Sequence, residues 1–163
     1  MKKLVLLSIM LAMVVIVLGA YTRLTDAGLG CPDWPGCYGH LSFSKTTENI
    51  ETAQQAFPDR PFEEHKAWNE MIHRYFASAL GFLILVIFIN SLFSKAYNKP
   101  VKLPLFLVLL VCFQGALGMW TVTLNLLPVV VMGHLLGGFT VLSGLFLLYL
   151  RLTPYRIPGG DHR

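Results

Sequence analysis

The chain has 163 residues, of which 55% are hydrophobic and 13% charged, and its formal net charge is +4. An ordinary soluble domain has about 25% charged residues, whereas residues 103–150 contain no Lys, Arg, Asp or Glu at all. These values exclude a soluble globular protein, a disordered chain and a nucleic-acid-binding domain, and they predict an integral membrane protein.

Four segments are long and apolar enough to cross a bilayer as helices. They are residues 4–22, 75–93, 103–123 and 127–150. The last two are separated by a break that ends at Pro128, a residue type that favours a helix start. The first segment has an alternative interpretation as a cleaved signal peptide, but it is longer than the usual apolar part of such peptides. We therefore expect an all-α fold in which residues 1–163 form a single domain, a transmembrane four-helix bundle.

The distribution of Lys and Arg predicts the orientation of these spans. With four spans, the two termini and the connection between the second and third spans lie on one side of the membrane. The basic residues of that side are Lys2, Lys3, Lys95, Lys99, Lys102, Arg151, Arg156 and Arg163, and its one acid is Asp161. Residues 23–74, by contrast, carry five basic and eight acidic residues. We expect both termini in the cytoplasm, one long outer loop at 23–74, and a location in the inner (plasma) membrane.

The outer loop opens with TDAGLGCPDWPGCYG, whose glycines and prolines exclude a long regular helix or strand. Cys31 and Cys37 flank the PDWPG segment within it. A loop this short lets two Cα atoms approach to the distance that a disulfide needs, and the outer compartment of bacteria is oxidising. A structural disulfide is the favoured interpretation, and a redox-active pair is the alternative. The later segment FEEHKAWNEMIHRYF predicts a helix leading into the second span.

Ionisable side chains in or near a span are costly, so each is a candidate functional residue. His134 lies alone within the long uncharged stretch, and Glu70 and His73 lie one helical turn apart at the start of the second span. Two imidazoles that face each other across a helical bundle can hold haem iron, provided that small residues leave room for the macrocycle. The alternative is a GxxxG helix-packing motif formed by Gly133 and Gly137, with His134 hydrogen-bonded to a neighbour.

Glu70 also has two interpretations. Glu70 and Arg74 are four residues apart, which suits an ion pair on one helix face. Beside a metal cofactor in a partly dry site, the same carboxylate is a candidate to accept a proton from water. The spacing leaves both interpretations open.

Taken together, four segments resemble the haem A synthase family, the membrane enzymes that convert haem O to haem A for cytochrome oxidase. These segments are GAYTRLTDAGLGCPDWPGCYG, EMIHR, QGALGMWTV and VVVMGHLLGG. They occur in the family's order and cover most of the chain apart from its two ends and residues 42–61. A single histidine in a span is a weak signal, whereas this combination is specific.

The resemblance implies roles for individual residues. His73 and His134 match the histidines that ligate haem iron in the amino-terminal half of such enzymes. Glu70 matches a carboxylate that is important for the oxidation. Cys31 and Cys37 match an outer-loop pair that can form a disulfide near the haem.

The implied reaction is the oxidation of a ring methyl of haem O to a formyl group through successive hydroxylations, with water as the oxygen source. Haem O is then the substrate, and haem B is a further candidate cofactor. Arg23 and Arg74 are candidate partners for the anionic haem propionates. The expected partners are the lipid bilayer and the haem O synthase that supplies the substrate, and no nucleic acid is expected.

Members of this family are typically about twice as long and contain two similar four-helix halves, of which this chain resembles only the first. It is therefore expected to be a half-size form that pairs with itself, a chain that pairs with a separately encoded second half, or a fragment. Two other functions stay open at this point. One is a bis-histidine membrane electron carrier that binds haem B, and the other is an inactive half that needs a partner.

Overall fold

The computed structural model describes residues 1–41, 47–58, 62–94 and 100–153. Within these ranges the regular elements are helices, apart from an isolated antiparallel bridge between Cys37 and His40. The helices are α1 (Lys2–Leu24), α2 (Thr47–Ala56), α3 (Glu64–Phe93), α4 (Lys102–Thr123) and α5 (Pro128–Arg151).

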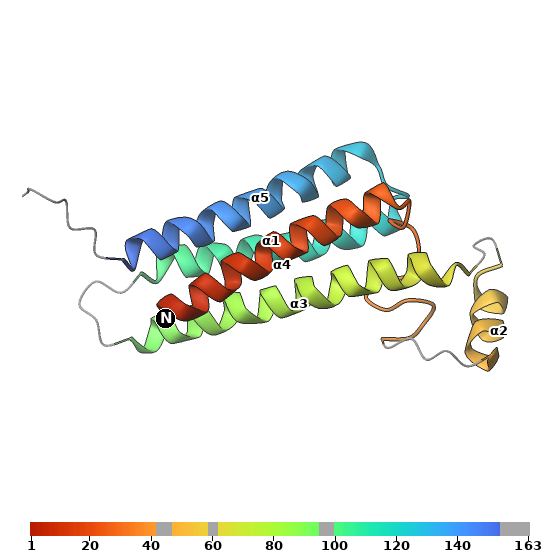
Figure 1. Ribbon diagram of the computed structural model, residues 1–163, viewed down its shortest axis with the longest axis horizontal. Helices are drawn as coiled ribbons and strands as arrows, with labels where there is room; N and C mark the ends of the chain where they lie inside the picture. The colour runs from red at the N-terminus through yellow and green to blue at the C-terminus, as the bar shows by residue number, and fades with distance from the viewer. Residues whose placement is uncertain (42–46, 59–61, 95–99, 154–163) are drawn as a thin grey trace, which may run out of the picture.

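Helices α1, α3, α4 and α5 are long and apolar enough to cross a membrane, so the expected all-helical membrane fold is confirmed. Helix α3 has 30 residues, which corresponds to about 45 Å at 1.5 Å per residue. This length exceeds the hydrocarbon thickness of about 30 Å, so part of α3 extends beyond the bilayer core. The helix expected from FEEHKAWNEMIHRYF is the first part of α3. No helix was predicted for α2, which lies beyond one end of the bundle (Figure 1).

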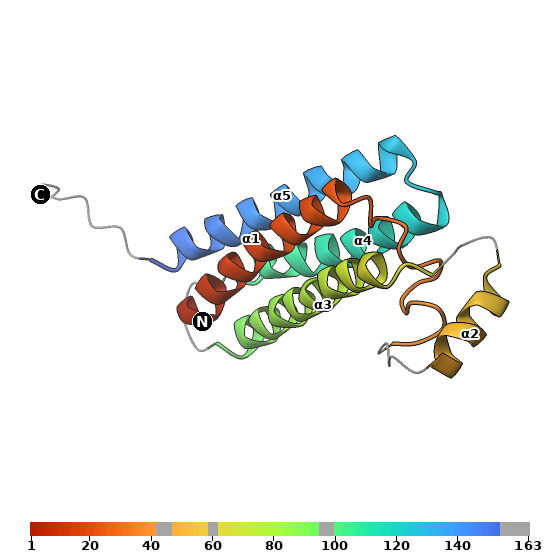
Figure 2. The same ribbon diagram turned by 45° about the vertical axis from the view of Figure 1, so that its right-hand side comes forward.

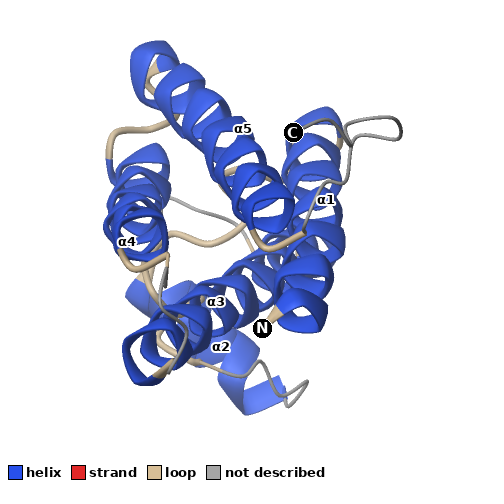
Figure 3. Cartoon of the chain, turned by 90° about the vertical axis from the view of Figure 1, so that its left-hand side faces the viewer, coloured by secondary structure: helices blue, strands red, loops and turns tan. Residues whose placement is uncertain are grey.

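The four long helices form a bundle in which neighbouring helices run antiparallel (Figure 1). Helix α1 contacts α3 and α5, and α4 contacts the same two helices. In the view along the bundle, α1 and α4 lie at opposite corners, as do α3 and α5 (Figure 3). An inward-facing residue of α3 therefore meets an inward-facing residue of α5 across the bundle axis.

One end of the bundle contains the start of α1, the end of α3, the start of α4 and the end of α5 (Figure 2). The basic residues Lys2, Lys3, Lys102 and Arg151 lie at this end. Several charged residues that support the predicted orientation lie outside the described residues: Lys45, Arg60, Lys95, Lys99, Arg156, Asp161 and Arg163. The cytoplasmic location of the termini and the outer location of residues 23–74 stay predictions.

The half of the bundle nearest this end is packed with large apolar side chains from all four long helices. They are Val5, Ile9, Ala12, Leu80, Ile84, Ile87, Leu107, Val141, Leu145 and Leu148. Helices α4 and α5 approach closely at Gly144, where an added Cβ would lie 2.7 Å from Leu107 Cδ2. In lipid, this kind of close packing holds helices together, because lipid tails are as apolar as the side chains. The other half contains His73 and His134, with glycines of α1 and α4 against them.

The turn between α4 and α5 covers the start of the outer loop. Asn125 and Leu126 both adopt positive φ values, of 49° and 58°. This conformation reverses the chain before Pro128 begins α5. The Leu126 side chain lies over Gly28, where an added Cβ would be 3.3 Å from Leu126 Cδ2. The α4–α5 turn and the outer loop therefore pack against each other at the same end of the bundle.

Candidate functional site

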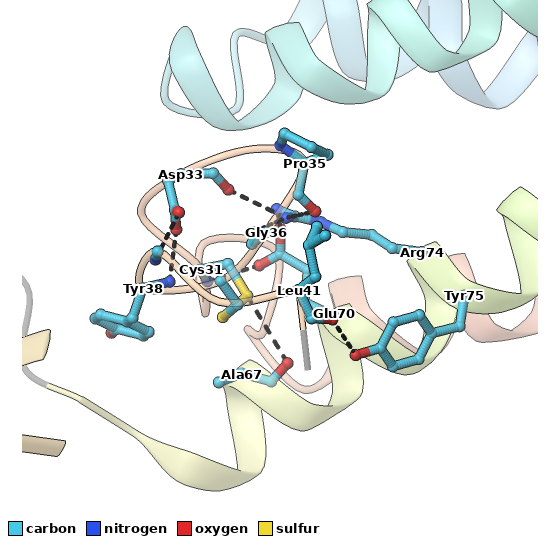
Figure 4. The surroundings of a disulfide bond; sticks show 12 residues. Cys31, Asp33, Pro35, Gly36, Tyr38, Leu41, Ala67, Glu70, Arg74 and Tyr75 are labelled. Atoms are coloured by element: carbon cyan, nitrogen blue, oxygen red, sulfur yellow. Dashed lines mark hydrogen bonds and ion pairs between the residues drawn. A yellow bond between two sulfur atoms is a disulfide. The ribbon is translucent and has the colours of Figure 1, made fainter. Parts of the chain in front are cut away.

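Residues 25–41, which we call the cysteine loop, fold back onto the first turns of α3 (Figure 4). The closest approach is at Gly30, where an added Cβ would lie 2.5 Å from the carbonyl group of Lys66. The next residue, Cys31, donates its backbone N–H to Glu70 Oε2 over 2.9 Å. The absence of a side chain at Gly30 thus lets the loop backbone reach a carboxylate on α3.

Arg74 binds the cysteine loop through hydrogen bonds to its backbone. Its Nη1 group donates to three backbone carbonyl oxygens, those of Asp33 (3.1 Å), Pro35 (3.3 Å) and Gly36. Its Nη2 group forms an ion pair with Glu70, and the two side chains are only 12% and 8% exposed. The ion pair that the i, i+4 spacing suggested is therefore present, and its arginine also binds the cysteine loop (Figure 4).

Cys31 and Cys37 form a disulfide with Cα atoms 4.8 Å apart, which confirms the predicted bridge. Both cysteines are fully buried and pack with Tyr38, Ala67 and Met71 in a small core. Partly buried aromatic residues of the outer loop and α3 cover this core. A bridge at the centre of a packed core supports the interpretation as a structural staple. A redox role for the pair stays a prediction.

Asp33 organises the tip of the cysteine loop, a role that the sequence did not reveal. Its carboxylate accepts the backbone N–H groups of Tyr38 (2.6 Å) and Gly39 (2.8 Å). Both of those residues have positive φ values, of 52° and 80°. The sequence feature that could have predicted this role is an aspartate within a Pro/Gly-rich turn, where short acidic side chains commonly accept hydrogen bonds from turn N–H groups.

His73 on α3 and His134 on α5 come from two helices that lie diagonally opposite in the bundle. His73 lies against Gly19 of α1, where an added Cβ would be 3.0 Å from His73 Cε1. His134 lies in the same way against Gly118 of α4, at 3.5 Å from His134 Cε1. The imidazoles are close enough that a charge on one would repel a charge on the other. The structure therefore brings together the two histidines that the sequence singled out.

Each imidazole has a nitrogen that no described protein group satisfies. Nδ1 of His73 and Nδ1 of His134 are buried and have no hydrogen-bond partner among the described residues. Each imidazole also has a backbone hydrogen bond, His73 with Val15 and His134 with Gln114, so the hydrogen-bonded alternative for His134 is present as well. Buried polar atoms without a partner are rare, so each calls for an explanation such as an absent ligand. Two neighbouring buried imidazoles with unsatisfied nitrogens fit such a ligand.

The two histidines suit haem iron better than a bare metal ion. Among the described residues, no group of three or more His, Cys, Asp or Glu side chains is arranged to hold a metal ion. A bare ion would therefore lack ligands beside the histidine pair. Haem iron, whose four equatorial ligands come from the porphyrin, needs only axial ligands from the protein.

The other predicted site residues lie toward the cysteine loop. Glu70 precedes His73 by one helical turn, but its carboxylate is directed to the N–H of Cys31 and to Arg74. Arg23 lies in the last turn of α1 with an exposed side chain. The catalytic role of Glu70 and the propionate contacts of Arg23 and Arg74 stay predictions.

Gln114 is a second residue that sequence reasoning missed. It is 7% exposed, and its side-chain amide occupies the space directly against Gly137 of α5, where a Cβ would clash with it. Its Nε2 is buried and has no hydrogen-bond partner among the described residues. The sequence feature that could have revealed Gln114 is a single amide in the QGALG segment of an otherwise apolar span.

The glycines of the GxxxG motif lie at the interface between α4 and α5. Gly133 faces Leu117 and Gly137 faces Gln114, so the alternative helix-packing role of these glycines coexists with the histidine pair.

Comparisons with known proteins identify the family of the chain. A family model described as cytochrome oxidase assembly protein matches residues 2–161. The chain is 57% identical to the heme A synthase of Shewanella oneidensis over 95% of this chain and 46% of the relative. It is 31% identical to the heme A synthase of Nitrosospira multiformis, over 69% of this chain and 35% of the relative. No solved structure matches. The chain thus spans about half the length of the relatives, or less.

Proposed function

The chain belongs to the family of cytochrome oxidase assembly proteins, and from that premise we propose that it takes part in haem A synthesis by oxidising a ring methyl of haem O to a formyl group. The resemblance to the haem A synthases is confirmed by the relatives that carry that name. Because the chain covers less than half of the Shewanella oneidensis relative, the activity of the whole relatives belongs to the proposal.

The observation that carries the proposal is the pair of neighbouring buried imidazoles, one on α3 and one on α5, with unsatisfied Nδ1 atoms. In the proposed complex, His73 and His134 are the axial ligands of the haem iron. They come from α3 and α5, which lie diagonally opposite in the bundle and are not packed side by side (Figure 3). When bound, haem O would supply the ring methyl that is oxidised, and the electrons released would pass to a separate acceptor.

Glycines supply room beside this ligand pair. Gly19 and Gly118 each face an imidazole, and a larger side chain at either position would displace the ring. At Gly115, an added Cβ would meet no atom within 4 Å. Small residues on helices that flank a histidine pair are what a flat macrocycle requires.

Glu70 is proposed to remove protons from the reacting methyl or water. Conversion of a methyl to a formyl group with water as the oxygen source releases four protons and four electrons, so the site needs a base and a separate electron acceptor. Glu70 lies one turn from His73, and Arg74 and the Cys31 N–H hold its carboxylate in place. The cysteine loop above it would limit access of bulk water to the reacting groups.

The proposal places the chain in the inner (plasma) membrane, where haem O synthase would supply the isoprenoid-bearing substrate. A lipid-embedded site suits a haem with a long apolar tail. A second four-helix unit, supplied by a second copy of this chain, by a separate half or by further residues of a longer chain, is proposed to complete the assembly and to bind haem B. The relatives' greater length supports the need for such a unit.

The proposal is tested by purifying the chain from cells that also make haem O and identifying the bound haems by extraction and mass analysis. We expect haem O, its hydroxylated product or haem A in the wild type, and none of them in His73→Ala or His134→Ala. His65→Ala is the matched control, because His65 is on the same helix as His73 with a side chain that is 69% exposed. Equal haem content in all four proteins would refute the ligand assignment.

The catalytic role of Glu70 needs a separate variant. Glu70→Gln should still bind haem but accumulate haem O or the hydroxylated product, and normal haem A formation by this variant would remove Glu70 from the mechanism. The same extraction distinguishes the other candidate functions. Haem B alone with reversible redox behaviour would identify a bis-histidine electron carrier, and a chain free of haem would identify an inactive half.

A further inference from the structure

From the buried amide of Gln114 we infer a specificity-determining contact: Gln114 donates a hydrogen bond to the hydroxyl group that distinguishes haem O from haem B. This inference rests on the proposed function, because it requires haem O between His73 and His134. It goes further by assigning recognition of one substituent to one side chain. No other residue role proposed above depends on it.

Gln114 lies one level deeper in the bundle than the histidine pair. On α4 it precedes Gly118, the residue that faces His134, by one turn or about 6 Å. On α5, Gly137 contacts Gln114 and lies three residues after His134. Because α5 runs antiparallel to α4, this step also leads away from the cysteine loop. The Gly118–His134 and Gln114–Gly137 contacts are therefore successive levels of the same α4–α5 interface, with Gln114 on the side away from the cysteine loop.

This level of α4 carries an unsatisfied donor, which lies against Gly137, and one residue further an open position. Gln114 is more than nine-tenths buried, and its Nε2 lacks a partner among the described residues. Next to it on α4, Gly115 is the position where an added Cβ would meet nothing within 4 Å. A buried amide N–H without a partner costs about 1–3 kcal/mol, so a polar ligand atom at this level would be favoured.

The chemistry of the substrate supplies such an atom. The propionates of a haem are anionic and favour the aqueous end of the bundle, where the cysteine loop lies. The half of the macrocycle without propionates then points toward the level of Gln114. In haem O that half carries a hydroxyl group on the first carbon of the isoprenoid substituent, whereas haem B has a vinyl group there. A site that is built to bind a hydroxyl group discriminates strongly against an analogue that lacks it.

The test compares haem O and haem B binding to detergent-solubilised wild type and Gln114→Met, a variant that keeps the length of the side chain and removes its donor. Binding is measured by titration with each haem and by the absorption spectrum. We expect haem O affinity to fall about tenfold or more while haem B affinity stays within a factor of two. Thr140→Val is the control, because it removes an exposed hydroxyl group from the same region of α5 and should change neither affinity.

Each outcome decides the inference. An unchanged haem O affinity in Gln114→Met would overturn it. An equal loss of both affinities would also overturn it, because Gln114 would then act by positioning His134 or by holding α4 against α5. A wild type that binds neither haem would refute the proposed function itself, which the histidine variants test independently. Unchanged haem B binding also shows that Gln114→Met is folded.

Discussion

The replacement Gly30→Ala tests how the cysteine loop is held on α3. The new Cβ would lie 2.5 Å from the carbonyl group of Lys66. That carbonyl belongs to the backbone of α3, so the loop has to move by about 1 Å to restore a contact distance of about 3.5 Å. A displacement of this size lengthens the bond from Cys31 N–H to Glu70, now 2.9 Å, beyond the usual range of about 2.7–3.2 Å.

The two consequences can be given approximate free energies. Overpacking a close contact costs about 1–3 kcal/mol, and loss of a buried hydrogen bond to a charged acceptor costs about 1.5–3 kcal/mol. Part of the strain is relieved when the hydrogen bond breaks, so the two costs do not add in full. The free energy needed to open the cysteine loop should therefore fall by about 3 kcal/mol. Because about 1.4 kcal/mol corresponds to a factor of ten, opening of the loop should become more frequent by on the order of 100-fold.

The rate of disulfide reduction measures this opening. The bridge between Cys31 and Cys37 is fully buried, so a small thiol reductant reaches it only through local opening. We expect reduction to be on the order of 100-fold faster in Gly30→Ala than in the wild type, at the same reductant concentration in detergent micelles. Gly81→Ala is the control, because its Cβ would make an ordinary 3.9 Å contact with Val111. Equal reduction rates in wild type and Gly30→Ala would refute the argument.

Three further replacements have defined outcomes. Arg74→Met leaves a buried carboxylate and three loop carbonyls without their donor, so the loop should be destabilised by about 3–5 kcal/mol; a wild-type rate of disulfide reduction would contradict this. Gly144→Ala creates a 2.7 Å contact in the packed half and should lower stability by about 1–3 kcal/mol, measured as a lower midpoint of thermal unfolding in detergent; an unchanged midpoint would show that the two helices shift freely. Gly19→Leu fills the space against His73 and should abolish haem binding without loss of the helical circular dichroism signal. Retained haem binding would show that contact with Gly19 does not fix the position of the His73 ring.

Much of the fold follows from the sequence for a simple physical reason. Backbone groups in a bilayer have to be satisfied within each segment, so long uncharged stretches are constrained to be helices. The same constraint made His134 conspicuous, because an imidazole has few reasons to be in an apolar span. The bridge between Cys31 and Cys37 was predictable from the length and composition of the segment between them.

Other features depend on contacts between distant parts of the chain. The spacing of Glu70 and Arg74 suggested an ion pair, but not that this pair binds a loop about 40 residues earlier in the sequence. Gln114 was missed because a single amide in a span has no periodicity that shows which helix it meets. Its significance comes from Gly137 opposite, which is a property of the α4–α5 register.

The end of the bundle near the cysteine loop contains the histidine pair with several glycines beside it, and this has a consequence for every variant in the site. Close packing is what holds helices together in lipid, and Gly19, Gly115 and Gly118 reduce it at the loop end. The cysteine loop supplies other connections there, because it joins the end of α1 to the first turns of α3 through Glu70 and Arg74. Glu70 is therefore at once the proposed base and an anchor of the loop. A loss of haem A formation in Glu70→Gln would be assigned to proton transfer only where disulfide reduction shows that the loop is still closed. A loss accompanied by rapid reduction would be assigned to an open site.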